Sequence, residues 1–186
     1  MTLKTLPAAP AVRPHARVES DLLPKAMERW NPAIKAAAGD DSTTITMYDP
    51  IGMDWWTGEG VTAKRVSAAL RSIGDKDITV KINSPGGDVF EGLAIYNLLR
   101  EHKGKVTVQV LGLAASAASF IAMAGDEIQI ARAGFMMIHN AWTIAAGDRN
   151  DFTEVADFLD QIDATLADIY SVRTGDEAAA MRALMD

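Results

Sequence analysis

A serine, a histidine and two adjacent glycines are the residues of this chain whose types and spacing suit covalent chemistry. Ser116 lies in the small-residue stretch "GLAASAASF", His139 closes the apolar run "GFMMIH", and Gly86 and Gly87 follow "INSP". A serine hydroxyl becomes a nucleophile when a base such as imidazole takes its proton, and a tetrahedral oxyanion needs backbone N–H donors. The chain offers one candidate for each of these roles.

Each candidate also has an ordinary structural explanation. A lone Pro-Gly-Gly is typical of a tight turn, and a phosphate-binding loop is not indicated, because neither G-x-G-x-x-G nor a Gly-Lys-Ser/Thr ending is present. A histidine that closes an apolar strand is commonly a structural residue. His15 lies in a proline-rich leader and His102 in the charged segment "REHKGK", so His139 is the one histidine at the edge of a predicted core.

The elements that must position these residues alternate between strands and helices. Period-2 patterns and short apolar runs predict strands at residues 43–49, 77–83, 105–112, 127–131 and 135–139. Helical spacing predicts a helix at 61–73, a small-residue helix at 116–124, and between them a helix with an apolar face of Phe90, Leu93, Ala94 and Leu98. Strands that alternate with helices imply a parallel sheet with right-handed crossovers, so the fold class is a layered α/β domain.

The candidate residues share one position relative to this sheet. Gly86 and Gly87, Ser116 and His139 each follow a predicted strand. In an open parallel sheet, ligands bind at the carboxyl ends of the strands. We therefore expect these residues to meet at one edge of the sheet, with Ser116 opening the helix that follows it.

The last long element is a helix expected over residues 150–172. Its apolar residues step by three and four positions and form a narrow stripe of Phe152, Val155, Leu159, Ile162, Leu166 and Ile169. The stripe suits packing on the chain's own domain, and it suits docking against a neighbouring subunit equally well. Asp148 and Asp151 lie at the start of this helix, where N-capping is their expected use.

The composition of the chain limits the classes of function that it can have. With 186 residues and 48% hydrophobic content the chain can bury one core, and a net charge of −7 argues against nucleic-acid binding. There is no cysteine, and the three histidines are scattered, so neither a metal site nor a disulfide is indicated, and no motif predicts a nucleotide or another cofactor. The sequence has no run of apolar residues long enough for a membrane helix and no signal-peptide core, so we expect a soluble cytoplasmic protein.

Residues 1–41 differ from the rest of the chain. They contain five of the seven prolines among alanines and basic residues, with one short helical segment at "KAMERW". This composition predicts a largely disordered extension that serves as a flexible leader, a removable pro-segment or a partner-binding arm. Residues 42–186 are then expected to form the folded domain.

Three segments resemble the signature blocks of the Clp protease proteolytic subunit family: "INSPGGDVFEGLAIYNLL", "GLAASAASFIAMAG" and "GFMMIHN". The resemblance covers roughly residues 43–186. It implies a ClpP/crotonase-like layered fold with a long C-terminal handle helix and the activity of a serine endopeptidase. The segments "MYDPIG" and "IHNAW" and the Pro-rich basic leader are most similar to bacteriophage or prophage head-maturation proteases within that family.

The resemblance implies a role for each site residue. Ser116 matches the nucleophile, His139 the general base, and Gly87 together with the N–H of Ala117 the oxyanion hole. Ser119 matches a small helix-packing residue and is assigned no role. The strand near "SPGG" is expected to bind an extended peptide by edge pairing.

The resemblance also implies partners. The helix at 150–172 matches the handle helix through which the family's rings stack, so homo-oligomeric rings are expected. Substrates would be capsid or scaffold proteins, or unfolded cellular chains, in the host cytoplasm or the assembling prohead. Any ATP dependence would come from a separate AAA+ unfoldase.

Two departures from the family concern the groove and the acid. Asn140, Ala141 and Trp142 stand where family members often have a proline, so the wall of the substrate groove is expected to differ. In the family, the triad aspartate follows the histidine by slightly more residues than this chain still has after His139. The chain ends at Asp186, in a predicted helix. We therefore expect a domain truncated at its C-terminus, with Asp186, a residue beyond it or another carboxylate as the acid.

Other functional classes stay open on the sequence. A housekeeping ClpP-type peptidase that works with an unfoldase has the same site residues. A crotonase-like acyl-CoA enzyme uses a related fold and a backbone oxyanion hole, but it does not require a serine and a histidine at these positions. An inactive structural subunit would explain a missing acid. A membrane-associated Ser-Lys peptidase is less favoured, because no membrane segment is predicted and His139 stands in the expected base strand.

Overall fold

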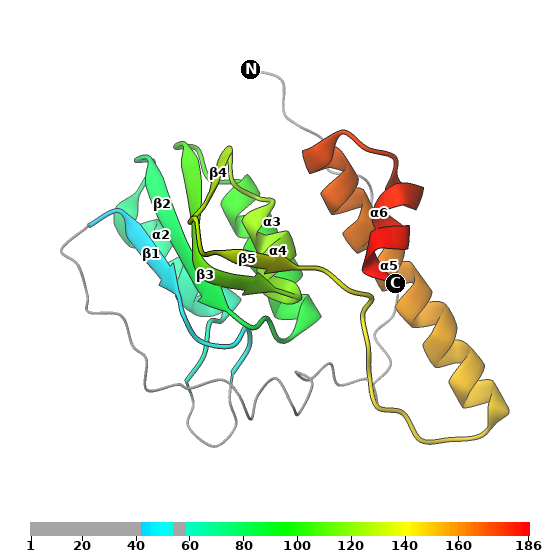
Figure 1. Cartoon of the computed structure of the whole chain (residues 1–186). Helices are drawn as coiled ribbons and strands as arrows, with labels where there is room; N and C mark the ends of the chain where they lie inside the picture. The colour runs from blue at the N-terminus through cyan, green and yellow to red at the C-terminus, as the bar shows by residue number, and fades with distance from the viewer. Residues whose placement is uncertain (1–41, 54–58) are drawn as a thin grey trace.

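The computed structural model of the chain describes residues 42–53 and 59–186 (Figure 1). The expectations for residues 1–41, including the helical segment at "KAMERW", lie outside the described residues. The elements, in chain order, are β1 (Thr44–Met47), α2 (Ala63–Ile73), β2 (Ile78–Ser84), α3 (Val89–Arg100), β3 (Val106–Ala115), α4 (Ala117–Ala122), β4 (Glu127–Ile130), β5 (Phe135–Met137), α5 (Arg149–Thr174) and α6 (Ala178–Met185). Each strand and helix predicted within these residues is confirmed.

The strands form one parallel five-stranded sheet, as the sequence predicts. Its order is β1-β2-β3-β4, and β5 also pairs with β3. β4 pairs with the first half of β3 and β5 with its last three residues, so both lie along the same strand one after the other. The carboxyl ends of β2, β3 and β5 are thereby brought close together.

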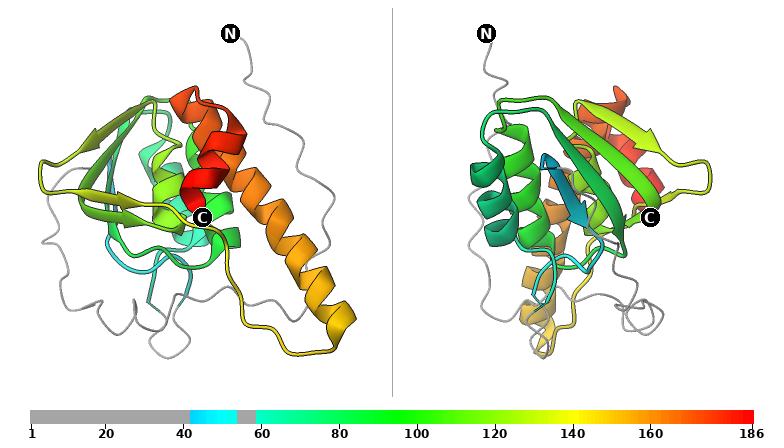
Figure 2. Two further views of the ribbon diagram at one scale, coloured as in Figure 1. Left: turned by 45° about the vertical axis from the view of Figure 1, so that its right-hand side comes forward. Right: turned by 90° about the vertical axis from the view of Figure 1, so that its left-hand side faces the viewer.

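Among the described elements, helices cover one face of the sheet. Helices α2, α3 and α4 lie against one side of the strands (Figures 1 and 2). β2 alternates strictly between buried and half-buried residues. Its buried Val80 and Ile82 face the same core as Val108 and Val110 of β3, and all four are fully shielded from water. Burying this apolar layer is the main stabilising contribution to such a domain.

The predicted apolar face of α3 is wrong, although the helix itself is confirmed. Ala94 is exposed and Phe90 is 40% exposed, whereas the buried side chains are those of Val89, Ile95, Tyr96 and Leu99. Apolar residues occupy most of the circumference of α3, so periodicity could not select the face that packs. Gly92 shows which face was chosen, because a Cβ there would lie 2.6 Å from the ring of Phe120 on α4.

Helix α5 begins with the N-cap that the sequence predicts. The side chain of Asp148 accepts hydrogen bonds from the N–H groups of Asn150 and Asp151, and the side chain of Asp151 accepts one from the N–H of Asp148. This capping box satisfies backbone donors that the first turn of a helix leaves without partners. Both carboxylates are therefore used structurally.

The apolar stripe of α5 is divided along its length. Phe152, near the start, is 52% exposed, whereas Ile162 and Leu166 are buried within the chain. Phe158 is also buried and stacks on Phe90, although it is absent from the predicted stripe. Figures 1 and 2 show the first turns of α5 reaching beyond the sheet and the other helices. Helix α5 packs on its own domain from Phe158 onward, whereas the residues of its first turn are exposed.

None of the helices in residues 42–53 and 59–186 is long and apolar enough to cross a bilayer.

Candidate active site

Ser116 sits at the junction of β3 and α4 in an unusual backbone conformation. Its φ is +51°, and it is the one non-glycine residue with a positive φ in the described part of the chain. Its N–H donates to the carbonyl oxygen of Met137 at the end of β5, at 2.9 Å. It is the N-cap of α4, but its hydroxyl makes no capping hydrogen bond. A strained conformation of this kind typically marks a functional position, and here it turns the hydroxyl out of the helix.

His139 follows β5 and faces that hydroxyl. Its Nε2 lies 2.8 Å from Oγ of Ser116, within hydrogen-bonding distance. Burial lowers the pKa of His139 below the usual value of 6.5, and the negative charge of Asp163 partly opposes this shift. A neutral imidazole with its hydrogen on Nδ1 accepts the serine proton at Nε2, so the two residues have the geometry of a nucleophile and its base.

The glycine turn after β2 lies against the turn of Ser116. A Cβ at Gly86 would come within 2.7 Å of Cβ of Ser116 and 2.8 Å of the backbone nitrogen of Ala117. Gly87 has a φ of +153°, and a Cβ there would lie 2.0 Å from the carbonyl oxygen of Ile51. Only glycine fits such close backbone approaches. The structure thus brings together Ser116, His139, Gly87 and Ala117, the residues selected from the sequence.

A small pocket opens beside the Ser116–His139 pair. Gly87, Ala117 and the apolar side chains of Val89, Phe120 and Leu166 line it. Trp142 and Ala141, which follow His139, form part of the wall, as the sequence suggested for the groove. Such a pocket next to a nucleophile would take an apolar group of a substrate.

The sequence left the acid open among Asp186, a residue beyond it and another carboxylate, and the structure adds Asp163 to the candidates. Asp163 of α5 is the one charged residue that is buried among those the structure describes, with 7% of its surface exposed. Its Oδ1 accepts a 2.6 Å hydrogen bond from the N–H of Ala141, two residues after His139. Burial raises the pKa of Asp163, whereas this hydrogen bond and the positive charges of Arg182 and His139 lower it.

A signal for Asp163 was present in the sequence. It lies four residues after Leu159 and three before Leu166, so a carboxylate occupies a position of the apolar stripe of α5. A charged residue on a buried face needs partners, and such residues often mark functional sites.

Asp186, the acid considered first by position, lies near the site but bonds elsewhere. Its Oδ1 accepts a 2.6 Å hydrogen bond from Nδ2 of Asn140, and the N–H of Asn140 donates to the carbonyl oxygen of Met185 at 3.0 Å. These contacts bring the end of α6 to the residue next to His139. Among the described residues, no side chain makes a hydrogen bond to Nδ1 of His139.

Ser119, to which the sequence assigned no role, makes two hydrogen bonds next to Ser116. Its side chain is completely buried, and its hydroxyl donates a 2.6 Å hydrogen bond to the carbonyl oxygen of Ser116. The same oxygen atom of Ser119 lies 2.7 Å from the hydroxyl of Tyr170 on α5. The sequence could not reveal this contact, because Tyr170 is 51 residues away.

No metal centre accompanies these residues within the described part of the chain. There, no three or more His, Cys, Asp or Glu side chains are grouped so that they could hold a metal ion.

Comparison with known proteins places these residues in a family context. The family model described as Clp protease matches residues 41–186. The chain is 33% identical over 127 residues to "ATP-dependent Clp protease proteolytic subunit 1" of Prochlorococcus marinus subsp. pastoris, covering 65% of each protein. It is 36% identical over 104 residues to "ATP-dependent Clp protease proteolytic subunit" of Pleurastrum terricola, covering 54% of this chain and 52% of that protein.

A solved structure supports the same comparison. A mutant ClpP1 from Listeria monocytogenes superposes with a TM-score of 0.65 at 25% identity, over 78% of this chain and 80% of that chain. In sequence, the matches span just under two thirds of the length of the first curated relatives, 65% and 62% for the two Prochlorococcus marinus proteins.

Proposed function

The chain belongs to the Clp protease family, and from this membership we propose that it is a serine endopeptidase acting through Ser116 and His139. The observation that carries the proposal is the 2.8 Å hydrogen bond between Nε2 of His139 and Oγ of Ser116. The two residues come from different strand ends, so their contact is a property of the fold and not of local sequence.

The proposed reaction uses these groups in two half-reactions. Nε2 of His139 takes the proton of Ser116 as Oγ attacks the substrate carbonyl, and the N–H groups of Gly87 and Ala117 stabilise the oxyanion. The imidazolium then gives its proton to the leaving amine, and the peptide bond breaks to leave an ester on Ser116. Water, activated by the same imidazole, hydrolyses the ester and restores the serine.

We assign the electrostatic part of the acid's role to Asp163. Its negative charge raises the pKa of His139 and so stabilises the imidazolium that forms during the reaction. Asp186 is the competing candidate, because its hydrogen bond to Asn140 holds it beside the residue that follows His139. Separate substitution of the two carboxylates distinguishes them.

The finer proposal is a role in phage or prophage head maturation, with capsid or scaffold proteins as substrates. It rests on "MYDPIG", "IHNAW" and the Pro-rich leader. The second candidate is a housekeeping peptidase that works with an AAA+ unfoldase, and the relatives' printed names, which include "ATP-dependent", favour it. Cleavage of a folded substrate only with an unfoldase and ATP would select the second candidate.

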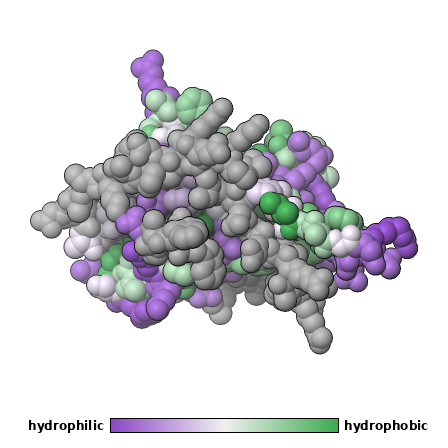
Figure 3. Space-filling model, turned by 90° about the horizontal axis from the view of Figure 1, so that it is seen from below, coloured by the Kyte–Doolittle hydropathy of each residue, from purple (hydrophilic) through white to green (hydrophobic). Residues whose placement is uncertain are grey.

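We also propose that the chain forms homo-oligomers, with rings as the expected form. Large apolar side chains remain on the surface, among them Phe135 at 71% and Ile144 at 74% exposed, in addition to Phe152 at the start of α5. Figure 3 shows apolar patches interrupting the hydrophilic surface on the face it presents. Exposed apolar patches commonly mark contact surfaces between subunits. Sedimentation of the protein with and without a Phe152→Ser substitution measures this directly.

The test of the catalytic proposal compares wild type with Ser116→Ala and His139→Ala. Wild type should hydrolyse unstructured peptides and be labelled by a fluorophosphonate at Ser116. Each substitution should reduce kcat by several orders of magnitude, up to ~10⁶, because the two residues act as a unit. Ser67→Ala on α2 is the matched control, since its hydroxyl only accepts a hydrogen bond from the Arg71 side chain.

Three results would contradict the proposal. Equal peptide hydrolysis by wild type and Ser116→Ala would exclude this serine as the nucleophile. No labelling of Ser116 in an assembled protein would favour an inactive structural subunit, and hydration of an acyl-CoA thioester would favour a crotonase-like enzyme. Mass spectrometry of the same samples also shows whether residues 1–41 are removed and whether removal needs Ser116.

A further inference from the structure

Two buried hydroxyls, which the proposed reaction does not use, lie directly behind the nucleophile. Ser119 of α4 is fully buried, and Tyr170 of α5 is 4% exposed. Oγ of Ser119 is 2.6 Å from the carbonyl oxygen of Ser116 and 2.7 Å from the hydroxyl of Tyr170. A buried polar chain of this length is costly unless all its members are satisfied, so its presence beside a reactive group needs an explanation.

The direction of the hydrogen bonds follows from counting hydrogens. A serine hydroxyl has one hydrogen, and the carbonyl oxygen of Ser116 can only accept, so Ser119 donates to Ser116. Tyr170 must then donate its own hydrogen to Oγ of Ser119. Burial raises the pKa of Tyr170 to about 12, so its hydroxyl keeps this hydrogen at neutral pH. The relay therefore runs one way, from Tyr170 through Ser119 to the carbonyl of Ser116.

The carbonyl at the end of the relay belongs to the peptide group that carries the N–H of Ala117. That carbonyl also accepts a 2.9 Å hydrogen bond from the N–H of Ser119. Hydrogen bonds to a carbonyl draw electrons from its amide nitrogen, which makes the N–H on the other side a stronger donor. The N–H of Ala117 is one of the two donors proposed for the oxyanion.

The relay also acts on the conformation of the turn. Ser116 has its positive φ between two anchors, since its N–H is held by Met137 of β5 and its carbonyl oxygen by Ser119. Strained backbone persists only where surrounding contacts determine it. Loss of the Ser119 hydroxyl would remove one of the two hydrogen bonds that hold the carbonyl oxygen of Ser116.

We propose that Tyr170 and Ser119 form a relay that polarises the Ser116–Ala117 peptide group and holds the nucleophile's turn, so that the Ala117 N–H binds the oxyanion more strongly. Both are positioning residues, because their hydroxyls bond to each other and to the carbonyl oxygen of Ser116, although Tyr170 also lines the pocket beside the nucleophile. The inference rests on the proposed function, since it concerns the oxyanion that forms at Ser116. Through the side chain of Tyr170, the relay also links α5 to the turn at Ser116.

The kinetic test uses Ser119→Ala, Tyr170→Phe and the double variant. Because the oxyanion donor acts in the transition state, kcat should fall ~10-fold in Ser119→Ala and ~3-fold in Tyr170→Phe, with KM almost unchanged. The double variant should equal Ser119→Ala alone, because Tyr170 acts only through Ser119. Tyr96→Phe, which removes a hydroxyl from another buried tyrosine on α3, should leave kcat unchanged. Multiplicative losses in the double variant, or an equal loss in Tyr96→Phe, would overturn the relay.

A second readout does not need hydrolysis. In an isotope-labelled full-length protein, the amide proton of Ala117 should move upfield in Tyr170→Phe, because its peptide group is less polarised, and Tyr96→Phe should not move it. An unchanged Ala117 resonance would refute the relay even if Ser116→Ala abolishes activity. A shifted Ala117 resonance in a protein whose hydrolysis survives Ser116→Ala would instead leave the relay standing and refute the proposed peptidase mechanism. Tyr170→Phe keeps the ring, so the test stands if Ser119→Ala fails to fold.

Discussion

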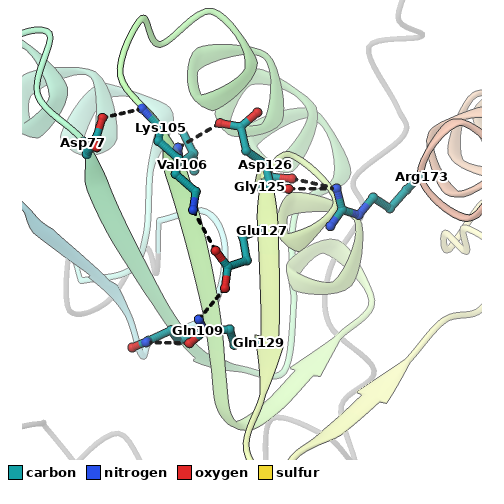
Figure 4. Close-up of polar contacts among 9 residues, drawn as sticks. All are labelled: Asp77, Lys105, Val106, Gln109, Gly125, Asp126, Glu127, Gln129 and Arg173. Carbon is teal, nitrogen blue, oxygen red and sulfur yellow. Dashed lines mark hydrogen bonds and ion pairs between the residues drawn. The ribbon is translucent and has the colours of Figure 1, made fainter.

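The two ends of the parallel sheet use polar side chains in opposite ways. At the amino ends of β2, β3 and β4, charged side chains contact one another, as Figure 4 shows for Lys105, Glu127 and their neighbours, and these two side chains are exposed. At the carboxyl ends, the polar groups of Ser84, Ser119 and Asp163 are buried, and Ser116 and His139 are half-buried beside them. The same strands thus end in two different environments.

At the amino ends the contacts are numerous but exposed. Nζ of Lys105 lies 2.7 Å from Glu127, and their side chains are 52% and 45% exposed. The carboxylates of Asp77 and Asp126 accept hydrogen bonds from the N–H groups of Lys105, just before β3, and Val106, its first residue. Arg173, at the end of α5, donates to the carbonyl oxygen of Gly125 (Figure 4). Exposed ion pairs contribute little, because water already solvates their charges.

At the carboxyl ends the contacts involve buried and half-buried groups. Ser84 donates to the carbonyl oxygen of Asp49 and accepts from the N–H of Gly86, which holds the glycine turn against Ser116. A buried polar group that loses its partner has no water to replace it. The comparison of the two ends indicates that the burial of a contact decides how much stability and activity a substitution there removes.

Gly87→Ala, at the carboxyl ends of the strands, should have the largest effect on stability and activity. The new Cβ meets the backbone of Ile51, and φ is unfavourable, so the turn must move. We expect a loss of about 3 kcal/mol in stability and at least ~10² in kcat/KM from a misplaced oxyanion donor. Denaturant unfolding and peptide hydrolysis measure the two effects.

Gly74→Ala is the matched control for that substitution. Gly74 also has a positive φ, but a Cβ there meets no atom within 4 Å. It should lose about 1–3 kcal/mol of stability to backbone strain alone, because its φ of +74° and ψ of −153° lie in a region essentially restricted to glycine, and it should leave kcat/KM unchanged. Equal stability and equal activity of Gly87→Ala and Gly74→Ala would show that the carboxyl ends of the strands are not especially sensitive to substitution.

A smaller effect, of about 10-fold in kcat, is expected for Asp163→Asn, since one charge that favours the imidazolium is lost. The amide oxygen can still accept from Ala141. In wild type, the acid limb of kcat/KM should lie below pH 6.5, because burial lowers the pKa of His139. Removing the negative charge of Asp163 lowers that pKa further, so the limb should move to lower pH.

The controls for Asp163→Asn are two other carboxylates. Asp168→Asn, on the exposed side of α5, should not move the pH profile. A shift to lower pH in Asp186→Asn, with none in Asp163→Asn, would assign the role of the acid to Asp186.

The smallest effect should come from the amino end. Lys105→Met removes the charge that faces Glu127 but keeps most of the side chain and the backbone hydrogen bond to Asp77. We expect Tm to change by no more than about 3 °C, less still in 1 M salt, and kcat to stay the same. A loss of activity in Lys105→Met would break the contrast between the two ends.

Local patterns in the sequence were sufficient to predict the strands and helices and the edge of the sheet where a reactive site could lie. Alternation predicted β2, three- and four-residue spacing predicted α5, and Asp148 marked its first turn, because these signals depend on neighbours along the chain. Residues after strand ends share one edge of a parallel sheet, so Ser116, His139 and Gly87 could be grouped before any distance was known.

Tertiary packing decided what periodicity leaves open. It selected the buried face of α3, left Phe152 of α5 exposed, and put Asp163 near the imidazole and Tyr170 behind Ser116. These outcomes depend on how α5 lies against α4 and on the loop after β5, where the contacting residues are far apart in the chain. The sequence by itself determined the strands, the helices and the edge of the sheet where the candidate residues meet. Only the folded chain decided which buried groups complete the site, because contacts between distant segments form only when the whole core is packed.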